Sequence, residues 1–200
     1  MKLLCCGDSL VNGFPFPRSF SFPSIIADET GIEVRNIGIN GITAADAAYY
    51  LKTKIGNHRS SYFDAVLISC GSNDFMLGMS GPGDVCSDVE TMCALSAECG
   101  IRQIYICSPP LTNPEQASGF WMPGVPYEKV NEDLKTYAGL LKNLVSGFRH
   151  APNADITFID IQKAYQDYGR YHDGVHPTKA GYRFIAETII IKMPDPMKRY

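Results

Sequence analysis

The chain has 200 residues, of which 45% are hydrophobic and 20% are charged, and its formal net charge is −3. This composition is typical of a soluble globular protein with one core. A slightly acidic chain without a basic cluster is a poor match for nucleic acid, whose phosphates attract a positive patch. Its apolar runs are shorter than the roughly 20 residues that span a membrane. We therefore expect one domain over residues 1–200, with neither a transmembrane segment nor a nucleic-acid partner.

The first residues, Met1 to Cys6, superficially resemble a secretory signal. The apolar run is too short for a signal peptide, and Gly7 and Asp8 interrupt it. We interpret it as a buried strand and expect a cytoplasmic location. The chain has 7 cysteines, an odd number without any Cys-x-x-Cys pair. This pattern predicts reduced, mostly buried thiols rather than a disulfide framework or a zinc site.

Apolar strands alternate with helices along the chain. Five short runs rich in apolar, β-branched residues predict strands that are buried on both faces and hence parallel, over residues 2–6, 32–37, 65–70, 101–107 and 156–161. Helical patterns fall at residues 43–53, 83–98, 127–146 and 179–191, and residues 194–200 look like a loose tail. The alternation predicts an α/β fold with helices on both faces of a parallel sheet.

The longest irregular stretch, residues 108–126, follows the fourth predicted strand and contains the only tryptophan, Trp121. Parallel α/β sheets hold their sites at the carboxyl ends of the strands, so this stretch should emerge beside the site. A long loop in a compact domain commonly acts as a lid or a binding loop.

Two motifs near opposite ends of the chain supply the parts of a nucleophilic site. Ser9 follows the first predicted strand on a turn that Gly7 permits, and Asp173 precedes His176 by three residues. A serine hydroxyl attacks a carbonyl when a histidine takes its proton and a carboxylate orients that histidine. Asp8 is expected to hold the turn closed by accepting backbone N–H groups.

Other residues compete for the roles of base and acid. His58 and His150 stand in polar, loop-like contexts, and His172 lacks a carboxylate three residues before it. Asp160 follows the fifth predicted strand and is the rival acid, although it is also a plausible polar strand end. A thiol enzyme that uses Cys6 as its nucleophile is a distant third hypothesis, because the place of Cys6 within a strand directs its side chain away from the site.

An oxyanion hole requires hydrogen-bond donors beside the nucleophile. Gly38 and Gly41 follow the second predicted strand, and either could offer a backbone N–H. Asn73 follows the third strand and could offer its side-chain amide, with Asp74 bracing the same loop.

Together, the GDSL at residues 7–10, the GSND at 71–74 and the DGVHP at 173–177 resemble the sequence blocks of the SGNH, or GDSL-type, esterase and lipase superfamily. The match extends from Gly7 to His176, with the blocks in the order of the family. The resemblance implies a three-layer α/β/α fold of flavodoxin type with a five-stranded parallel sheet. It favours Gly41 over Gly38, because the glycine of the family lies just before a helix.

The resemblance implies a serine ester hydrolase that acts on small acylated molecules through an acyl-enzyme, without a metal or organic cofactor. Its residues would be the triad Ser9, Asp173 and His176, with an oxyanion hole of Ser9, Gly41 and Asn73. A carbohydrate acetylesterase and a catalytically silent binding protein on the same fold are the alternatives. Phe14, Phe75 and Trp121 are candidates for an apolar substrate-binding wall, or for ordinary packing. Neither the physiological substrate nor the oligomeric state follows from the sequence.

Overall fold

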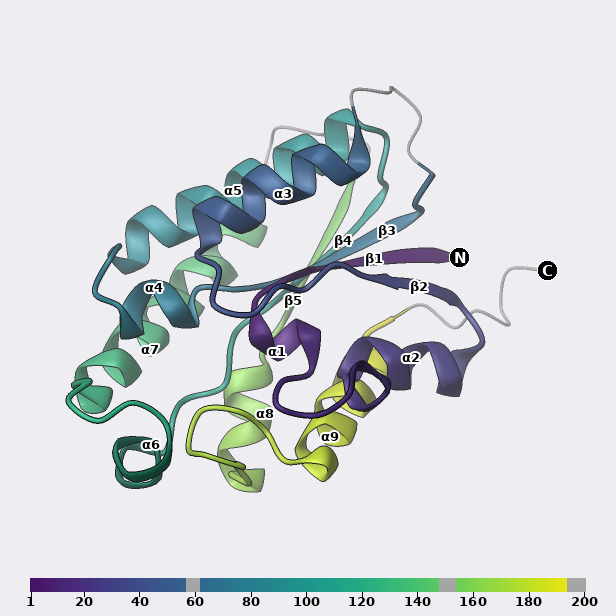
Figure 1. Ribbon diagram of the computed structural model, residues 1–200. Helices are drawn as coiled ribbons and strands as arrows, with labels where there is room; N and C mark the ends of the chain where they lie inside the picture. Colours follow the sequence, from purple (N-terminus) through teal and green to yellow (C-terminus); the bar gives the residue numbers. More distant parts are fainter. Residues whose placement is uncertain (57–61, 148–153, 194–200) are drawn as a thin grey trace.

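The computed structural model describes residues 1–56, 62–147 and 154–193. Within them, a five-stranded parallel sheet with the order β2-β1-β3-β4-β5 forms the centre of the molecule (Figure 1). The strands are β1 (Lys2–Gly7), β2 (Glu33–Asn36), β3 (Ala65–Ser69), β4 (Gln103–Cys107) and β5 (Asp155–Ile159). This order is that of flavodoxin-like folds, and it reverses direction between β1 and β3. Ligands of such sheets bind beside this reversal, at the carboxyl ends of the strands.

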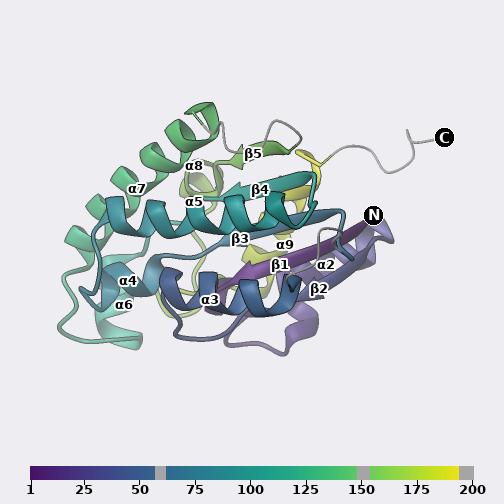
Figure 2. The same ribbon diagram turned by 90° about the horizontal axis from the view of Figure 1, so that it is seen from above.

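Helices cover both faces of the sheet, which confirms the predicted three-layer α/β/α fold. The helices α3 (Ala44–Ile55), α5 (Pro82–Glu98) and α7 (Tyr127–Gly147) lie side by side on one face (Figure 2). On the other face lie α2 (Phe22–Thr30), α8 (Ile161–Tyr168) and α9 (Lys179–Ile190) (Figure 1). Short elements follow the strands: α1 (Ser9–Asn12), the 3₁₀ turn η1 (Arg18–Phe20), α4 (Ser72–Met76) and α6 (Pro114–Phe120).

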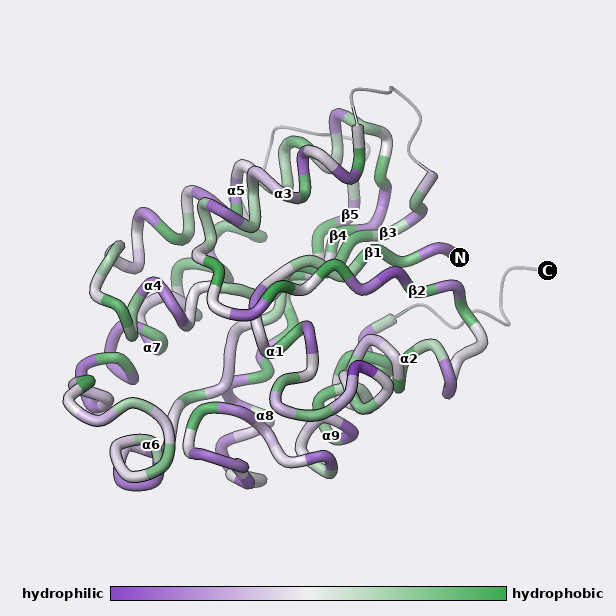
Figure 3. Tube along the Cα trace, in the orientation of Figure 1, coloured by the Kyte–Doolittle hydropathy of each residue, from purple (hydrophilic) through white to green (hydrophobic). Residues whose placement is uncertain are grey.

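The core consists of two apolar clusters, one on each face of the sheet. Along β1, Leu4 and Cys6 face α3 and α5, whereas Leu3 and Cys5 face α2 and α9. All four side chains are fully buried, which explains why the strand is a continuous apolar run rather than an alternating pattern. Figure 3 shows the same hydrophobic character along β1, β3 and β4 at the middle of the sheet. No described helix is both long enough and apolar enough to cross a bilayer.

The outer strands differ from the prediction of burial on both faces. The β2 strand is an edge strand, and its residues Glu33 and Arg35 are exposed. The predicted fifth strand extends too far, because Asp160 caps α8 by accepting the N–H of Lys163 at 2.9 Å. The capping bond turns the chain into a helix before Ile161, which therefore belongs to α8.

The structure also contains helices that the sequence pattern did not predict. The stretch 108–126 is not wholly irregular, since Asn113 caps α6 within it. The helix α2 begins at a Ser21 cap with a proline in its first turn and ends at Gly31. His58, His150 and the tail at 194–200 lie outside the described residues.

Candidate active site

The turn after β1 places Ser9 at the central carboxyl edge of the sheet. Asp8 caps α1 by accepting the N–H of Leu10 at 2.9 Å, and Ser9 is the first residue of that helix. Gly7 is required for close approach rather than for the turn alone. A Cβ at this position would lie 1.8 Å from the carbonyl oxygen of Ser69 on β3. Any larger residue would therefore separate β1 from β3 just below Ser9.

Ser9, His176 and Asp173 form a continuous hydrogen-bonded series. Ser9 Oγ lies 3.0 Å from His176 Nε2, and His176 Nδ1 lies 2.8 Å from Asp173 Oδ2. The three residues are 8%, 1% and 5% exposed. Because an ionised carboxylate only accepts hydrogen bonds, it favours the tautomer with the proton on Nδ1. Nε2 is then free to accept the hydroxyl proton of Ser9.

The carboxyl of Asp173 is held in its charged form. Burial raises its pKa, but hydrogen bonds from the His176 ring and from the N–H groups of His176 and Val175 outweigh that effect, and the pKa falls below its ordinary value. These N–H groups donate to Asp173 Oδ1 at 2.8 Å and 3.0 Å. The turn thus fixes both oxygens of the carboxylate, one for the backbone and one for the imidazole.

The helix α6 supports the turn that carries Asp173 and His176. The N–H of Asn113 donates to the carbonyl of Gly174 at 2.7 Å, and the Gln116 amide donates to the carbonyls of Tyr171 and His172. A Cβ at Gly174 would lie 2.2 Å from the backbone nitrogen of Ala117, so the turn packs directly on α6. The stretch 108–126 therefore contributes structurally to the site.

The candidate oxyanion donors lie on neighbouring loops. Asn73 Nδ2 donates one hydrogen to the carbonyl of Ile42 at 2.9 Å, which leaves its second amide hydrogen available. No hydrogen bond to another described residue engages the backbone N–H of Ser9 or Gly41. The N–H of Gly38 is already bound to Asn36 Oδ1 at 2.8 Å. The geometry therefore favours Gly41 over Gly38 as a donor.

A polar network that sequence analysis missed anchors the loop before Gly41. The Arg18 guanidinium donates to Asn12 Oδ1 and to the carbonyls of Asn36 and Gly38. Asn36 also donates to the carbonyl of Val11 at 2.7 Å. These bonds join η1 and α1 to the segment after β2. No local motif marks Arg18, because its partners come from two segments that are separate in the sequence.

Two of the three predicted wall residues lie beside the imidazole. The rings of Phe14 and Trp121 contact His176 edge-on, with centroids 4.7 Å and 4.6 Å away, and lie 5.5 Å from each other. Tyr182 fixes Phe14 by donating to its carbonyl at 2.6 Å. Phe75 lies apart from them, 6% exposed, with its ring packed against Tyr137.

The competing residues take other roles. The ring of His172 is in edge contact with that of Phe16, and Asp160 caps α8. The thiol of Cys6 is fully buried and 3.6 Å from the carbonyl of Ala47, and burial raises its pKa to about 12. Such a thiol supplies almost no nucleophilic thiolate at neutral pH.

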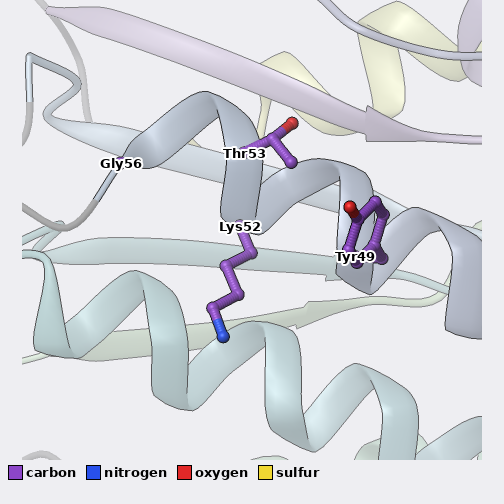
Figure 4. Close-up of a pocket in the computed structure, with 4 residues that line it drawn as sticks. All are labelled: Tyr49, Lys52, Thr53 and Gly56. Atoms are coloured by element: carbon purple, nitrogen blue, oxygen red, sulfur yellow. The ribbon is translucent and has the colours of Figure 1, made fainter.

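No group of three or more histidine, cysteine or acidic residues in the described part of the chain could hold a metal ion. A hollow of about 350 Å³ lies on α3, lined by Tyr49, Lys52, Thr53 and Gly56 (Figure 4). It sits toward the end of α3 that faces away from Ser9, so it is separate from the site described above.

Comparison with known proteins identifies the family of this chain. The family model described as GDSL-like lipase/acylhydrolase matches residues 3–189. An arylesterase of Vibrio mimicus is 34% identical over 108 residues, which cover 52% of each protein, so the chain spans about half the length of this curated relative.

Two solved structures show the same fold. A member of the lipolytic G-D-S-L family from Veillonella parvula has a TM-score of 0.78 at 19% identity, covering 96% of this chain and 97% of the other. A carbohydrate acetylesterase family member from Sinorhizobium meliloti has a TM-score of 0.73 at 21% identity, with the same coverage of 96% and 97%. Because the family model extends over nearly all of the described residues, the chain belongs to the GDSL-like lipase/acylhydrolase family.

Proposed function

We propose that this protein is a serine ester hydrolase in which Ser9 is the nucleophile, His176 the general base and Asp173 the residue that orients it. The observation that carries the proposal is the unbroken series of contacts, 3.0 Å from Ser9 to His176 and 2.8 Å from His176 to Asp173. Membership in the GDSL-like lipase/acylhydrolase family supports the same chemistry.

The proposed reaction has two steps. Ser9 Oγ attacks the ester carbonyl as its proton passes to His176 Nε2, and the carbon–oxygen bond to the alcohol breaks as that proton passes to the departing oxygen. A water molecule then attacks the acyl-enzyme, gives a proton to His176 and releases the acid, while Ser9 recovers its proton. Asp173 stays ionised and stabilises the imidazolium in both steps.

The negative oxygen of each tetrahedral intermediate would rest on three donors: the N–H groups of Ser9 and Gly41 and the free amide hydrogen of Asn73. Donors that are held in place before the reaction stabilise the developing charge without reorganising. The bonds that already restrain the Gly41 and Asn73 loops support this assignment.

The two aromatic rings beside His176 indicate which kind of leaving alcohol the site would accept. His176 protonates that alcohol, so the alcohol must lie beside the imidazole when it departs. Phe14 and Trp121 flank the imidazole, and flat groups pack favourably against such rings. We infer that the preferred substrates are esters of a phenol or of a sugar ring. The arylesterase relative and the carbohydrate acetylesterase-like structure are consistent with these two classes.

Replacing Trp121 with alanine is expected to weaken recognition of aryl esters selectively. One ring contact contributes about 1 kcal/mol, so kcat/KM should fall about 3- to 10-fold more for phenyl acetate than for ethyl acetate. Phe120→Ala is the matched control, because this neighbouring ring is 77% exposed. Equal losses on both acetates would contradict the leaving-group assignment.

A parallel series of longer p-nitrophenyl esters and an acetylated sugar would separate lipid-like from carbohydrate substrates.

Covalent labelling tests the proposed function as a whole. A fluorophosphonate should label the protein at Ser9, and the label should be absent from Ser9→Ala. A catalytically inactive binding protein with this fold would not react with the fluorophosphonate. Labelling at another residue, or an unlabelled protein that binds the esters without hydrolysing them, would overturn the proposal.

A further inference from the structure

Two buried carboxyl groups lie outside the proposed Ser9–His176–Asp173 series. Asp8 is 0% exposed and Asp74 is 1% exposed. Each follows a central strand, Asp8 directly after β1 and Asp74 within α4 after β3. Each also has one buried oxygen, Asp8 Oδ2 and Asp74 Oδ1, without a hydrogen-bond partner among the described residues. Burying such groups is costly, so their position beside the site calls for a structural or functional reason.

The groups that face these carboxyls are all acids or neutral hydrogen-bonding groups. Those interacting with Asp8 are Cys6, Cys70, Asp74, Tyr137 and Tyr182, and those interacting with Asp74 are Asp8, Asp46, Cys70, Asp88 and Tyr137. None of these neighbours carries a positive charge. Both carboxyls are therefore held by backbone N–H groups rather than by ion pairs.

Asp8 lies in the turn between β1 and α1. Its Oδ1 accepts the N–H of Leu10 at 2.9 Å, which closes the turn that presents Ser9. The N–H of Ser72, the residue before Asn73, also favours the charged form of Asp8 and lowers its pKa. The hydrogen bond to Leu10 therefore restrains the turn after β1, and the Ser72 N–H acts on Asp8 without a hydrogen bond to it.

Asp74 connects the loop of Asn73 with the loop of Gly41. Its Oδ2 accepts the N–H of Ala44 at 3.0 Å, at the start of α3. The hydrogen bond from Asn73 Nδ2 to the carbonyl of Ile42, at 2.9 Å, joins the same two segments. Two bonds from adjacent side chains therefore fix the short segment that follows Gly41.

We propose that Asp8 and Asp74 are positioning residues for the oxyanion donors: Asp8 closes the turn that presents Ser9, and Asp74 fastens the segment bearing Asn73 to the segment bearing Gly41. The inference rests on the proposed function, because it assigns these donors to ester hydrolysis. Neither carboxyl touches the substrate. Asp74 links the segment after β3 to the segment after β2, and Asp8 restrains the turn after β1. A misplacement of about 1 Å in such a constellation can cost on the order of 100-fold in rate.

The test compares Asp74→Ala with Asp74→Asn. The alanine variant loses the bond to Ala44, and kcat on p-nitrophenyl acetate should fall about 10- to 100-fold with KM nearly unchanged. The asparagine oxygen can still accept the Ala44 N–H, so Asp74→Asn should recover most of the turnover. Asp160→Ala is the matched control, because Asp160 also accepts a backbone N–H at a helix start, yet it caps α8. It should lower the thermal midpoint without lowering kcat.

A double-mutant cycle separates positioning from general stability. If Asp74 acts through the donor loops, Asp74→Ala should cost less in an Asn73→Ala background than in the wild type. Equal costs in both backgrounds would overturn the proposal, as would full activity of Asp74→Ala. These results require an active wild-type enzyme. A wild-type protein that hydrolyses no ester would instead contradict the proposed function.

A separate experiment tests the role of Asp8 with the variant Asp8→Asn. Burial raises the pKa of Asp8 to about 7, with a further increase from the charge of Asp74. The folded state then holds this proton more tightly than the unfolded chain, so stability is lost as the pH rises from about 4 toward 7. Asp8→Asn carries no charge to bury. Its thermal midpoint should exceed that of the wild type by more at pH 8 than at pH 5, with most of kcat retained. A constant difference, or a loss of turnover as large as that of Asp8→Ala, would count against the role of Asp8.

Discussion

Replacing Ser9 with alanine should reduce the hydrolysis of p-nitrophenyl acetate by roughly 10⁴- to 10⁶-fold, the range expected when a serine nucleophile is removed. His176→Ala should lose a similar amount, because the hydroxyl 3.0 Å away then has no base. The double variant should be little worse than either single one, since the residues act as a unit. Steady-state rates with freshly purified variants would measure all three losses.

Stability provides the control for these variants. Within the described part of the chain, the Ser9 hydroxyl makes one hydrogen bond, with His176, so Ser9→Ala should change the thermal midpoint only slightly. Ser96→Ala is a suitable comparison, because Ser96 is fully buried on α5 and its hydroxyl donates to the carbonyl of Met92. It should keep full activity. Substantial turnover by Ser9→Ala would exclude Ser9 as the nucleophile.

The Asn73→Ala substitution should have the second largest effect, a fall in kcat of about 100- to 1,000-fold with little change in KM. The amide would stabilise negative charge that exists only in the transition state, so ground-state binding should hardly change. The variant also loses the 2.9 Å bond to the carbonyl of Ile42, a cost of about 1 kcal/mol in stability.

Thr43→Ala separates the two consequences of the Asn73 change. Thr43 caps α3 by accepting the N–H of Asp46 at 3.2 Å, so its loss weakens the same segment by about 1 kcal/mol without removing an oxyanion donor. If Thr43→Ala lowered kcat as strongly as Asn73→Ala, the loss would reflect loosening of the loop. A fully active Asn73→Ala would show that the oxyanion assignment is wrong.

The central strands could be predicted because burial on both faces leaves a continuous apolar run, as in β1, β3 and β4. The edge strand β2 shows the limit of that rule, since Glu33 and Arg35 face solvent where no further strand covers them. The short helix α8 was missed because, among its residues whose burial the structure describes, Ile161 and Tyr165 are the only buried apolar ones. Two positions are too few to reveal a helical period.

The candidate site was predictable to the extent that each residue lies in a short motif. Ser9, Asn73 and the Asp173–His176 pair each stand at a strand end or a tight turn, where a local pattern marks them. No local pattern reveals the hydrogen bonds by which α6 supports the turn of Asp173 and His176, because Gln116 and its partner, the carbonyl of Tyr171, are 55 residues apart. The structural reason to prefer Gly41 over Gly38 is that the Gly38 N–H already donates to the Asn36 side chain, a bond that the sequence does not reveal. The cytoplasmic location stays a prediction.

The separation of 167 positions along the sequence between Ser9 and His176 has a consequence for the protein during its synthesis. The nucleophile would leave the ribosome well before its proton acceptor, which would appear only after β5 has been made. On the proposed mechanism, a nascent polypeptide could assemble its whole sheet and still be unable to acylate. Activity would begin only when the turn before α9 is released and docks, so incomplete translation products would be inert towards esters in the cell.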